Sequence, residues 1–371
     1  MRQPPRRRLF EDRLPAPAAG VRAEIPGFEG VRLGVSEAES SLSAAADRLA
    51  LPTDDAAPEA FNILAISGGA AGGAYGAGVL TGLSRAGARP KFAIVTGVST
   101  GALIAPFAFL GPEWDYRLAQ AYTGGYAAEA LSLKRLAPAF GGGLFAAEAL
   151  ESLIDPFVDE ALLAAVAREH AAGRRLIVST TDLDRQTACM WDMGAIASRG
   201  GEQAAALFRD VLIASASLPG LFPPRRFSCE AGGEAYEEMH VDGGVSSPLF
   251  IMPEALLRWR DLGRRLAGGC IYVIVNTVLE EAPRTTHANL PSILVRSFET
   301  MLRYSYRQAL GVAAGFCAAH ALPMKVVSIP DAPENGSMLN FETDAMRRIF
   351  DEAAAFAGRQ DPWSTPALGG E

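Results

Sequence analysis

The sequence FAIVTGVSTGALIAPFAFL, residues 92–110, indicates the fold class, because an apolar run, a serine between two glycines and a second apolar run follow one another. The first run has the length of a buried strand, and the second is compatible with a helix. Similar short apolar runs recur at residues 61–66, 175–181, 270–278 and 324–329. Helix-period patterns fill several gaps between them, for example residues 145–170 and 204–215. This alternation predicts an α/β fold with three α/β/α layers around a mostly parallel central sheet.

The length and composition indicate how the 371 residues are organised. Because 49% of them are hydrophobic and 20% charged, a disordered, collagen-like or coiled-coil chain is excluded. We expect residues 1–60, rich in proline, alanine and acidic residues, to form an extended or partly disordered arm with a short helix near residues 41–51. Residues 61–330 are expected to form one catalytic domain, and residues 331–371 a helical extension and tail.

A long helix is expected between the last two predicted strands. Asn289 has the side chain of a helix cap, Pro291 suits the first turn, and the helical pattern runs towards His320.

The charged and metal-binding residue types exclude several classes of partner. The formal charge of −8 argues against nucleic acid, which needs clustered lysine and arginine. The four cysteines form no Cys-x-x-Cys pair and no two histidines stand three to five residues apart, so we expect buried free thiols, no metal and no cofactor. No apolar run reaches the ~18 residues that span a bilayer, and no apolar segment of a signal peptide follows the first arginines. The sequence predicts a cytoplasmic protein or one that contacts membranes from outside.

The motif GVSTG, residues 97–101, has the pattern Gly-x-Ser-x-Gly at the end of a predicted strand. In a nucleophile elbow the serine occupies a strained strand-to-helix turn, and flanking glycines allow the backbone to pack tightly. The same five letters also arise by chance in a glycine-rich chain. Their position between a strand and a helix favours Ser99 as a nucleophile.

The segment SGGAAGGAYGAG, residues 67–78, follows the first predicted strand and leads into a helix. Glycines there expose successive backbone N–H groups beside a helix N-terminus, which attracts negative charge. An oxyanion hole or a phosphate site fits this arrangement, and close helix packing alone explains it too. The nucleotide-binding patterns Gly-x-Gly-x-x-Gly and Walker A are not matched, so the oxyanion hole is favoured.

The third motif is HVDGGV, residues 240–245. Asp-Gly alone is usually an ordinary turn. Its significance comes from the order of the three motifs: an anion-binding loop, then a serine elbow, then an aspartate on a glycine turn.

These residues resemble the patatin-like phospholipase family. Its members combine a glycine-rich oxyanion loop, a Gly-x-Ser-x-Gly nucleophile and an Asp-Gly-Gly or Asp-Gly-Ala motif. The resemblance covers about residues 61–330. It includes ASASLPGLFPP, residues 214–224, and TTDLDRQTACMWDMGAIAS, residues 180–198, which look like further blocks of the family.

The resemblance implies a patatin-like fold and a lipid acyl hydrolase of the phospholipase A or esterase type, active in lipid degradation. Ser99 would be the nucleophile and Asp242 its partner in a catalytic dyad. The remaining implied site residues are Gly68, Gly69, Ala70, Ala71, Gly72 and Gly73 in the oxyanion loop, Gly97 and Gly101 in the elbow, and Gly243 and Gly244 after the aspartate. The loop departs from the family pattern, because Ala70 replaces the third glycine and Gly72 replaces a basic residue or asparagine.

A serine hydroxyl needs a base, and an exposed carboxylate with a pKa near ~3.9 is a weak one. We therefore expect Asp242 to lie within hydrogen-bond reach of Ser99 in an apolar cleft that raises its proton affinity. The implied substrate is a phospholipid or another lipid ester. Residues 102–110 and 218–222 suit either an acyl groove or core packing, and Trp191, Met193 and the aromatics of residues 298–306 are expected in the core.

Three alternatives stay open on the residues alone. A Ser-His-Asp triad of the α/β-hydrolase type would use His287 or His320, while His240 is expected to share a strand face with Asp242. A non-catalytic lipid-binding scaffold with a vestigial site would explain the altered glycine loop. Acyl transfer to an alcohol would use the same acyl-enzyme as hydrolysis.

Overall fold

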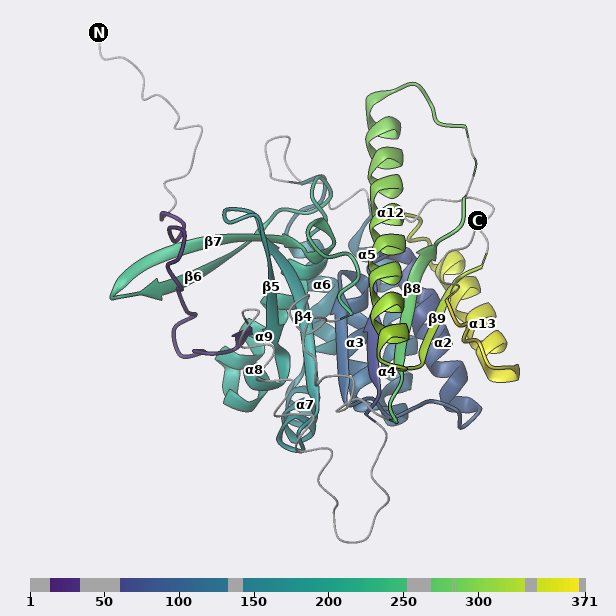
Figure 1. Ribbon diagram of the computed structural model, residues 1–371. Coiled ribbons are helices and arrows are strands. Elements are labelled where there is room, and N and C mark those ends of the chain that lie inside the picture. Colours follow the sequence, from purple (N-terminus) through teal and green to yellow (C-terminus); the bar gives the residue numbers. More distant parts are fainter. Residues whose placement is uncertain are drawn as a thin grey trace, which may run out of the picture.

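The computed structural model describes residues 14–33, 61–132, 143–251, 268–281, 283, 285–330 and 339–366 (Figure 1). Nine strands among these residues form one sheet in the order β1-β5-β4-β3-β2-β8-β9, with β7 beside β4 and β6 beside β7. The strands are β1 Arg32–Leu33, β2 Ile63–Ile66, β3 Ile94–Val98, β4 Arg175–Asp182, β5 Thr187–Asp192, β6 Arg225–Ala231, β7 Glu234–Asp242, β8 Ile271–Val278 and β9 Met324–Ile329.

The centre of the sheet is parallel, as predicted. Strands β4, β3, β2, β8 and β9 run in one direction, and each coincides with one of the five apolar runs. All residues of β2, β3 and β4 are buried, which is the signature of a sheet covered on both faces. Their carboxyl ends therefore meet at one edge, where ligands of open α/β sheets bind.

The flank beyond β4 is antiparallel, which the simple strand–helix alternation did not predict. Strand β4 turns back into β5 as a hairpin, and β6 and β7 form a second hairpin. The first part of β4 pairs with β3, and its end pairs with β7. Strand β7 thus takes the place of β3 where β3 ends, so its last residue lies close to the start of the following helix.

The described part of the N-terminal arm belongs to the domain. Strand β1 pairs with β5, and Ala23, Ile25, Phe28 and Val31 are buried in the main core. The expected helix near residues 41–51 lies outside the described residues.

Helices cover both faces of the sheet. Alternate residues of β2 point in opposite directions: Leu64 and Ile66 join one hydrophobic core, and Ile63 and Ala65 join the other. The second core is covered by Leu302 and other residues of α12. The helices are η1 Ala70–Gly72, α2 Gly73–Arg85, α3 Thr100–Leu110, η2 Pro112–Trp114, α4 Asp115–Thr123, α5 Tyr126–Ala130, α6 Glu148–Ile154, η4 Asp155–Phe157, α7 Glu160–Ala171, α8 Met193–Arg199, α9 Gly201–Ala216, η5 Gly243–Val245, α12 Leu290–Ala319 and α13 Thr343–Arg359.

The helix-period pattern over residues 145–170 corresponds to more than one helix. The segment is divided into α6, η4 and α7, because Pro156 interrupts the helical hydrogen bonding and Asp159 starts a new helix by accepting from the Leu162 N–H at 2.9 Å. In contrast, α12 begins and ends as predicted. The Asn289 side chain caps it by accepting from the Ser292 N–H at 3.0 Å.

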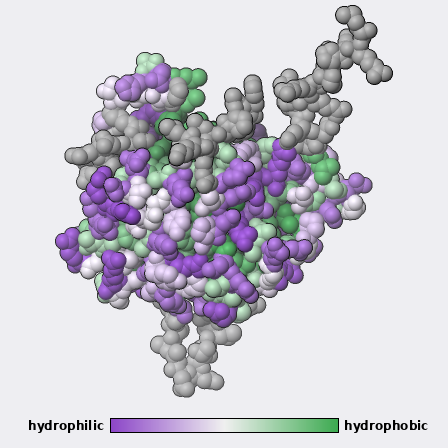
Figure 2. All heavy atoms as spheres, turned by 180° about the vertical axis from the view of Figure 1, so that it is seen from behind, coloured by the Kyte–Doolittle hydropathy of each residue, from purple (hydrophilic) through white to green (hydrophobic). Residues whose placement is uncertain are grey.

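Helix α13, beyond residue 330, packs directly on α2. A Cβ at Gly78 would lie 2.3 Å from the Phe350 carbonyl oxygen, and one at Gly82 would lie 2.3 Å from that of Ala354. These two glycines of α2, the first of which ends the glycine-rich segment, therefore allow close helix packing. Helix α12 covers the other face, and its outer end rises above the sheet (Figures 1 and 2). Among the helices described, none is both long enough and apolar enough to cross a bilayer.

Candidate active site

Ser99 lies in a tight turn between β3 and α3. Its φ of 55° is in the left-handed region, where residues other than glycine are uncommon. A Cβ at Gly97 would lie 2.5 Å from the Gly101 carbonyl oxygen, and a Cβ at Gly101 would lie 2.3 Å from that of Ile66. Both glycines of the motif are therefore required by close backbone contacts, and the turn holds the partly exposed Ser99 side chain outward.

Asp242 reaches Ser99 through the register of β4. Val98, the last residue of β3, pairs with Ser179, and Asp242, the last residue of β7, pairs with the next residue, Thr180. The Ser99 hydroxyl donates a hydrogen bond to Oδ2 of Asp242 at 2.6 Å. Ser99 and Asp242 are 143 positions apart in the sequence. They meet because β7 pairs with the end of β4, just beyond the residues of β4 that pair with β3.

The glycines after Asp242 fix its carboxylate. The Gly244 N–H donates to Oδ1 at 2.7 Å, which leaves Oδ2 for Ser99. A Cβ at Gly243 would lie 2.3 Å from the Ser179 carbonyl oxygen, so the turn packs against the end of β4. Each oxygen of the Asp242 carboxylate therefore has its own hydrogen-bond donor.

Burial raises the pKa of Asp242 to about 6, although the hydrogen bonds from Ser99 and the Gly244 N–H oppose this shift. Only 2% of the residue is exposed, so the charged form has lost nearly all of its water. A carboxylate with this proton affinity is a better base than an exposed one, and it is still mainly ionised at neutral pH.

The glycine-rich loop from Gly68 to Gly73 lies against Ser99. A Cβ at Gly68 would be 3.2 Å from the Ser99 Cβ. The Gly68 N–H donates to the Pro248 carbonyl, the Gly72 N–H to Gly69, and the Gly73 N–H to Ala70 and Ala71. Among the described residues, no acceptor is found for the N–H groups of Gly69, Ala70 and Ala71. These three N–H groups are the ones in the loop that can bind an anion.

Asn276, at the end of β8, holds this loop, and the sequence analysis missed it. Its Nδ2 donates to the Ser67 carbonyl at 2.8 Å, and its Oδ1 accepts from the Gly76 N–H at 3.1 Å. Its carbonyl oxygen would lie only 2.1 Å from a Cβ at Gly69 and 2.2 Å from one at Gly72. Without movement of β8, the side chain that the family usually carries at the position of Gly72 does not fit here. A polar residue at the carboxyl end of a parallel strand was the available signal.

Tyr306 and Ser215 were also missed. Tyr306 was expected in the core and is 1% exposed, but its hydroxyl would be 3.2 Å from a Cβ at Gly68 and it hydrogen-bonds Ser67. Burial and the charge of Asp242 raise its pKa, so it stays a neutral phenol. The Ser215 hydroxyl accepts from the Ser99 N–H at 3.0 Å, so this N–H is already occupied.

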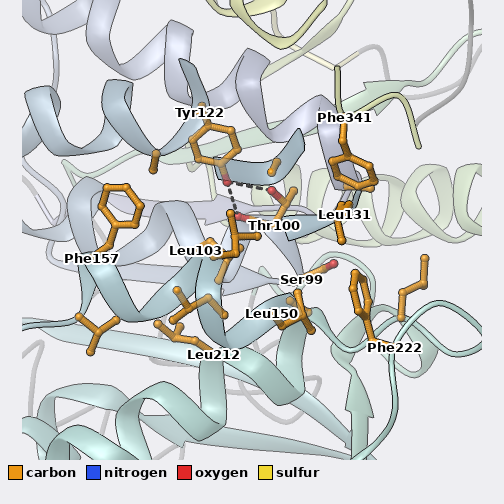
Figure 3. A pocket seen from close by; sticks show the side chains of 18 of the residues that line it. Ser99, Thr100, Leu103, Tyr122, Leu131, Leu150, Phe157, Leu212, Phe222 and Phe341 are labelled. Carbon is orange, nitrogen blue, oxygen red and sulfur yellow. Dashed lines mark hydrogen bonds between the residues drawn. The ribbon is translucent and has the colours of Figure 1, made fainter. Parts of the chain in front are cut away.

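An apolar pocket extends from Ser99 between the helices of the main core (Figure 3). Ala70 lines it beside Ser99, and Figure 3 shows Phe157 at the opposite side of the pocket from Phe222. Both segments that the sequence left between core and groove contribute to its wall. The other lining residues are Thr100, Leu103, Pro106, Phe107, Ala121, Tyr122, Ala127, Leu131, Leu150, Leu153, Ile154, Val158, Leu162, Leu212, Ala216, Leu218, Leu221, Phe341 and Met346.

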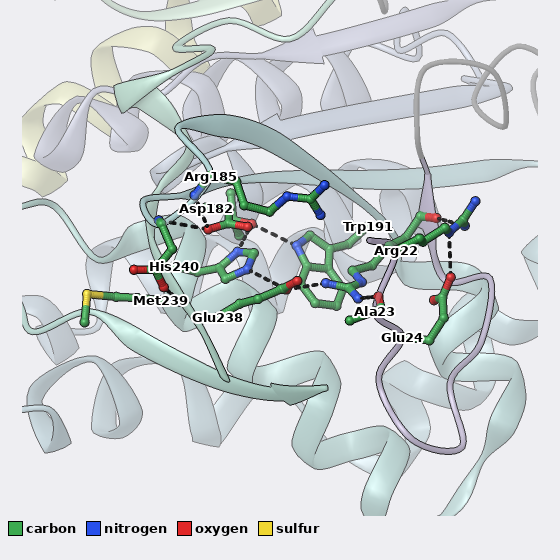
Figure 4. Close-up of polar contacts among 12 residues, drawn as sticks. Arg22, Ala23, Glu24, Asp182, Arg185, Trp191, Glu238, Met239 and His240 are labelled. Atoms are coloured by element: carbon green, nitrogen blue, oxygen red, sulfur yellow. Dashed lines mark hydrogen bonds and ion pairs between the residues drawn. The ribbon is translucent and has the colours of Figure 1, made fainter. Parts of the chain in front are cut away.

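His240 shares β7 with Asp242 but has other partners (Figure 4). The Trp191 Nε1–H donates to the Thr180 hydroxyl at 2.9 Å, and this hydroxyl contacts Nδ1 of His240 at 2.8 Å. We assign the hydroxyl proton to the second contact, so Nδ1 accepts and Nε2 carries the hydrogen that faces Glu238 at 3.4 Å. His240 is therefore a fully buried strand residue with a satisfied ring.

Asp182, Glu238 and His240 are the one group among the described residues whose ligand atoms lie close enough to hold a metal ion. Arg32 already forms an ion pair with Glu238, and Oδ1 of Asp182 accepts from two backbone N–H groups of the following turn. Although burial alone would raise the pKa of Glu238, His240 and Arg32 lower it. The arrangement is a buried ion-pair network that joins β1 to β7, and the guanidinium disfavours a second cation.

The other two histidines of the triad alternative lie elsewhere. His287 is exposed ahead of α12, and His320 follows its last residue and contacts the Phe316 ring at 4.4 Å between centroids. In the described part of the chain, neither forms a hydrogen bond or an ion pair with Ser99 or Asp242. Neither His287 nor His320 is therefore placed to act as the base of a Ser-His-Asp triad.

The family is decided by the match to protein-family models. The model of the patatin-like phospholipases matches residues 64–254, more than half of the chain. The chain belongs to the patatin-like phospholipase family. All three motifs lie within the matched range, and the family supports a lipid-ester hydrolase in broad terms.

Two solved structures similar to this patatin-like chain are VipD from Legionella pneumophila and human GIVD cytosolic phospholipase A2. The first has a TM-score of 0.35 and 13% identity, over 80% of this chain and 68% of VipD. The second has a TM-score of 0.42 and 13% identity, over 91% of this chain and 64% of the human protein. No curated protein sequence matches the chain.

Proposed function

We propose that the protein hydrolyses the carboxylic ester bonds of lipids through an acyl-enzyme, with Ser99 as nucleophile and Asp242 as base. The observation that carries the proposal is the 2.6 Å contact between the Ser99 hydroxyl and the buried Asp242 carboxylate. The pocket beside Ser99 is apolar and suits an acyl chain. Membership of the patatin-like family supports a lipid substrate.

In the proposed reaction Oγ of Ser99 attacks the ester carbonyl carbon while its proton passes to Oδ2 of Asp242. The oxyanion accepts hydrogen bonds from the N–H groups of Gly69 and Ala70. Asp242 then donates the proton to the leaving alcohol oxygen. A water molecule then loses a proton to Asp242 and attacks the acyl carbon. When the acyl–oxygen bond to Ser99 breaks, Asp242 returns this proton to Oγ of Ser99, and the fatty acid is released.

The test of this function is covalent labelling combined with fatty-acid release. A fluorophosphonate probe is expected to label wild-type protein on the peptide that contains Ser99, as mapped by mass spectrometry. The same preparation is expected to release fatty acid from phospholipids or simple lipid esters. A folded protein that neither reacts with the probe nor releases fatty acid would instead be a non-catalytic scaffold.

Activity is expected to depend on the ionisation of Asp242. Because its pKa is raised to about 6, the base is lost as the pH falls through about 6. We expect kcat/KM for an uncharged ester to fall about tenfold between pH 7 and pH 5 and to be nearly constant above pH 7. A profile that stays flat down to pH 5 would contradict a base with a raised pKa.

Acyl-chain preference is expected to change when the pocket is narrowed. Ala127 lines the pocket beside the Tyr126 and Phe157 rings, which are 5.0 Å apart. In Ala127→Phe we expect kcat/KM to fall about tenfold for long-chain esters and to change little for short-chain ones. The matched control is Ala164→Phe, which adds the same ring at an exposed position of α7. Equal losses for short and long chains would argue against an acyl site in this pocket.

A further inference from the structure

Helix α12 has an apolar stripe that is exposed and that no other element of the described residues covers. Residues 290, 293, 294, 301, 304 and 312 fall on one helix face, because with 3.6 residues per turn they lie within an arc of about 100°. Each is between 47% and 68% exposed. The side chains of this stripe are Leu290, Ile293, Leu294, Met301, Tyr304 and Val312. Aromatic residues of this segment were expected in the core, and for Tyr304 this expectation is wrong.

The outer part of α12 stands apart from the core. All the fully buried residues of the helix lie from Leu302 onward, among the residues whose burial is described. Figure 1 shows this outer end rising above the sheet, and Figure 2 shows hydrophobic side chains exposed there. From Leu290 to Tyr304 the helix is about 21 Å long. This length of apolar helix surface is unusual on a protein that has no partner for it.

The charges of α12 lie beside the stripe and are mostly positive. The helix contains Arg296, Arg303 and Arg307 but a single acidic residue, Glu299, which is 3.4 Å from Arg296. The Arg303 guanidinium lies 6.0 Å from the Tyr304 ring, and Arg307 is exposed one turn further on. An apolar face flanked by arginines is the pattern of helices that lie in a lipid–water interface.

The face of α12 opposite the stripe borders the candidate active site. Leu302 Cδ2 would lie 3.9 Å from a Cβ at Gly244, next to Asp242. One turn later the Tyr306 hydroxyl contacts the glycine loop near Ser99. Val245, which follows the Asp-Gly-Gly turn, is also 44% exposed. A bilayer bound to the stripe would therefore lie against the helix whose opposite, buried face borders Ser99 and Asp242.

We propose that the stripe of α12 docks the protein on the surface of a lipid bilayer, with Arg303 and Arg307 at the phosphate groups of anionic headgroups. This inference rests on the proposed lipid substrate and adds the place where the substrate surface binds. The flanking arginines favour an anionic bilayer as the partner of the stripe. A second copy of the chain is disfavoured, because its own stripe would bring the same arginines to the contact although its net charge is −8.

The experiment is flotation with vesicles of phosphatidylcholine, alone or with phosphatidylglycerol, using protein that carries Ser99→Ala. This background separates binding from catalysis. We expect binding that is stronger with phosphatidylglycerol, and a roughly 100-fold weaker partition coefficient in the triple variant Leu290→Ser, Ile293→Ser, Leu294→Ser. Tyr304→Ser is expected to weaken binding, whereas Tyr116→Ser, which removes an equally exposed tyrosine from α4, is not.

In protein that retains Ser99, the triple variant is expected to hydrolyse vesicle phospholipid at least tenfold more slowly than wild type. Its rate on a dissolved short-chain ester is expected to stay unchanged. If wild type floats but hydrolyses neither substrate, the proposed function fails and the docking proposal stands. The docking proposal is overturned if wild type does not float, or if the triple variant floats equally well. It is also overturned if the stripe variants dissociate a dimer in sedimentation experiments without changing flotation.

Discussion

Replacing Asp242 by asparagine is expected to reduce ester hydrolysis by roughly 10³- to 10⁴-fold while the protein stays folded. Asparagine has the same shape as aspartate and keeps an oxygen for the Gly244 N–H, but it cannot take the proton of Ser99. The residual rate would come from the oxyanion loop and from binding alone. Labelling of Ser99 by a fluorophosphonate should slow by a similar factor, because the hydroxyl is no longer activated.

The measurement is kcat/KM on one ester for wild type, Asp242→Asn, Ser99→Ala and the double variant. If the two residues act as a unit, the double variant is no slower than Ser99→Ala. His287→Ala and His320→Ala serve as controls for a triad and are expected to keep wild-type activity. Retention of more than a tenth of the activity in Asp242→Asn, or its loss in either histidine variant, would reject the dyad.

Stability should move in the opposite direction from activity. The folded-state pKa of Asp242 is raised, so its contribution to stability is present at low pH and is lost as the pH rises through about 6. Asparagine carries no charge at any pH. We therefore expect Asp242→Asn to unfold at the same or a higher temperature than wild type at pH 8, which separates a lost base from a lost fold.

Much of the sheet and the position of Ser99 could be predicted from the sequence because their signals are local. A buried parallel strand is a continuous apolar run, and a tight turn after it requires glycine. The five parallel strands and the cap of α12 at Asn289 follow from such patterns. The hairpin from β4 to β5 was missed because the alternation rule assigns every gap to a helix, although Asp182 and Asp184 are turn-forming residues at this position.

The partners of the site residues depend on contacts that no local pattern encodes. Asn276 holds the glycine loop only because β8 lies beside β2, and this neighbourhood is a property of the sheet order. By sequence, Tyr306 is an ordinary core aromatic. Its hydroxyl reaches Ser67 only because α12 crosses the end of β2. Tyr304 was placed in the core because hydrophobicity alone does not tell which end of a long helix extends beyond the sheet.

Replacing Gly101 by alanine is expected to destabilise the protein by at least ~3 kcal/mol, which for a chain of this length corresponds to a fall in Tm of roughly 4 °C or more. The added Cβ would lie 2.3 Å from the Ile66 carbonyl oxygen and 2.6 Å from that of Ser67. These are backbone atoms at the end of β2, so no side-chain rotation can relieve the contact. Moving them displaces the glycine loop, and ester hydrolysis should fall together with stability.

The matched control for this variant is Gly315→Ala, because both glycines lie within helices and have ordinary φ values. A Cβ at Gly315 meets nothing within 4 Å, so only the helix preference of alanine acts there. We expect Gly315→Ala to gain up to ~1 kcal/mol, and thermal unfolding of both variants measures the difference. If Gly101→Ala unfolded at the wild-type temperature, the close packing of the elbow against β2 would be wrong. If it lost stability but kept full activity, the loop beside Ser99 would not depend on that packing, and the oxyanion site would have to be formed by other N–H groups.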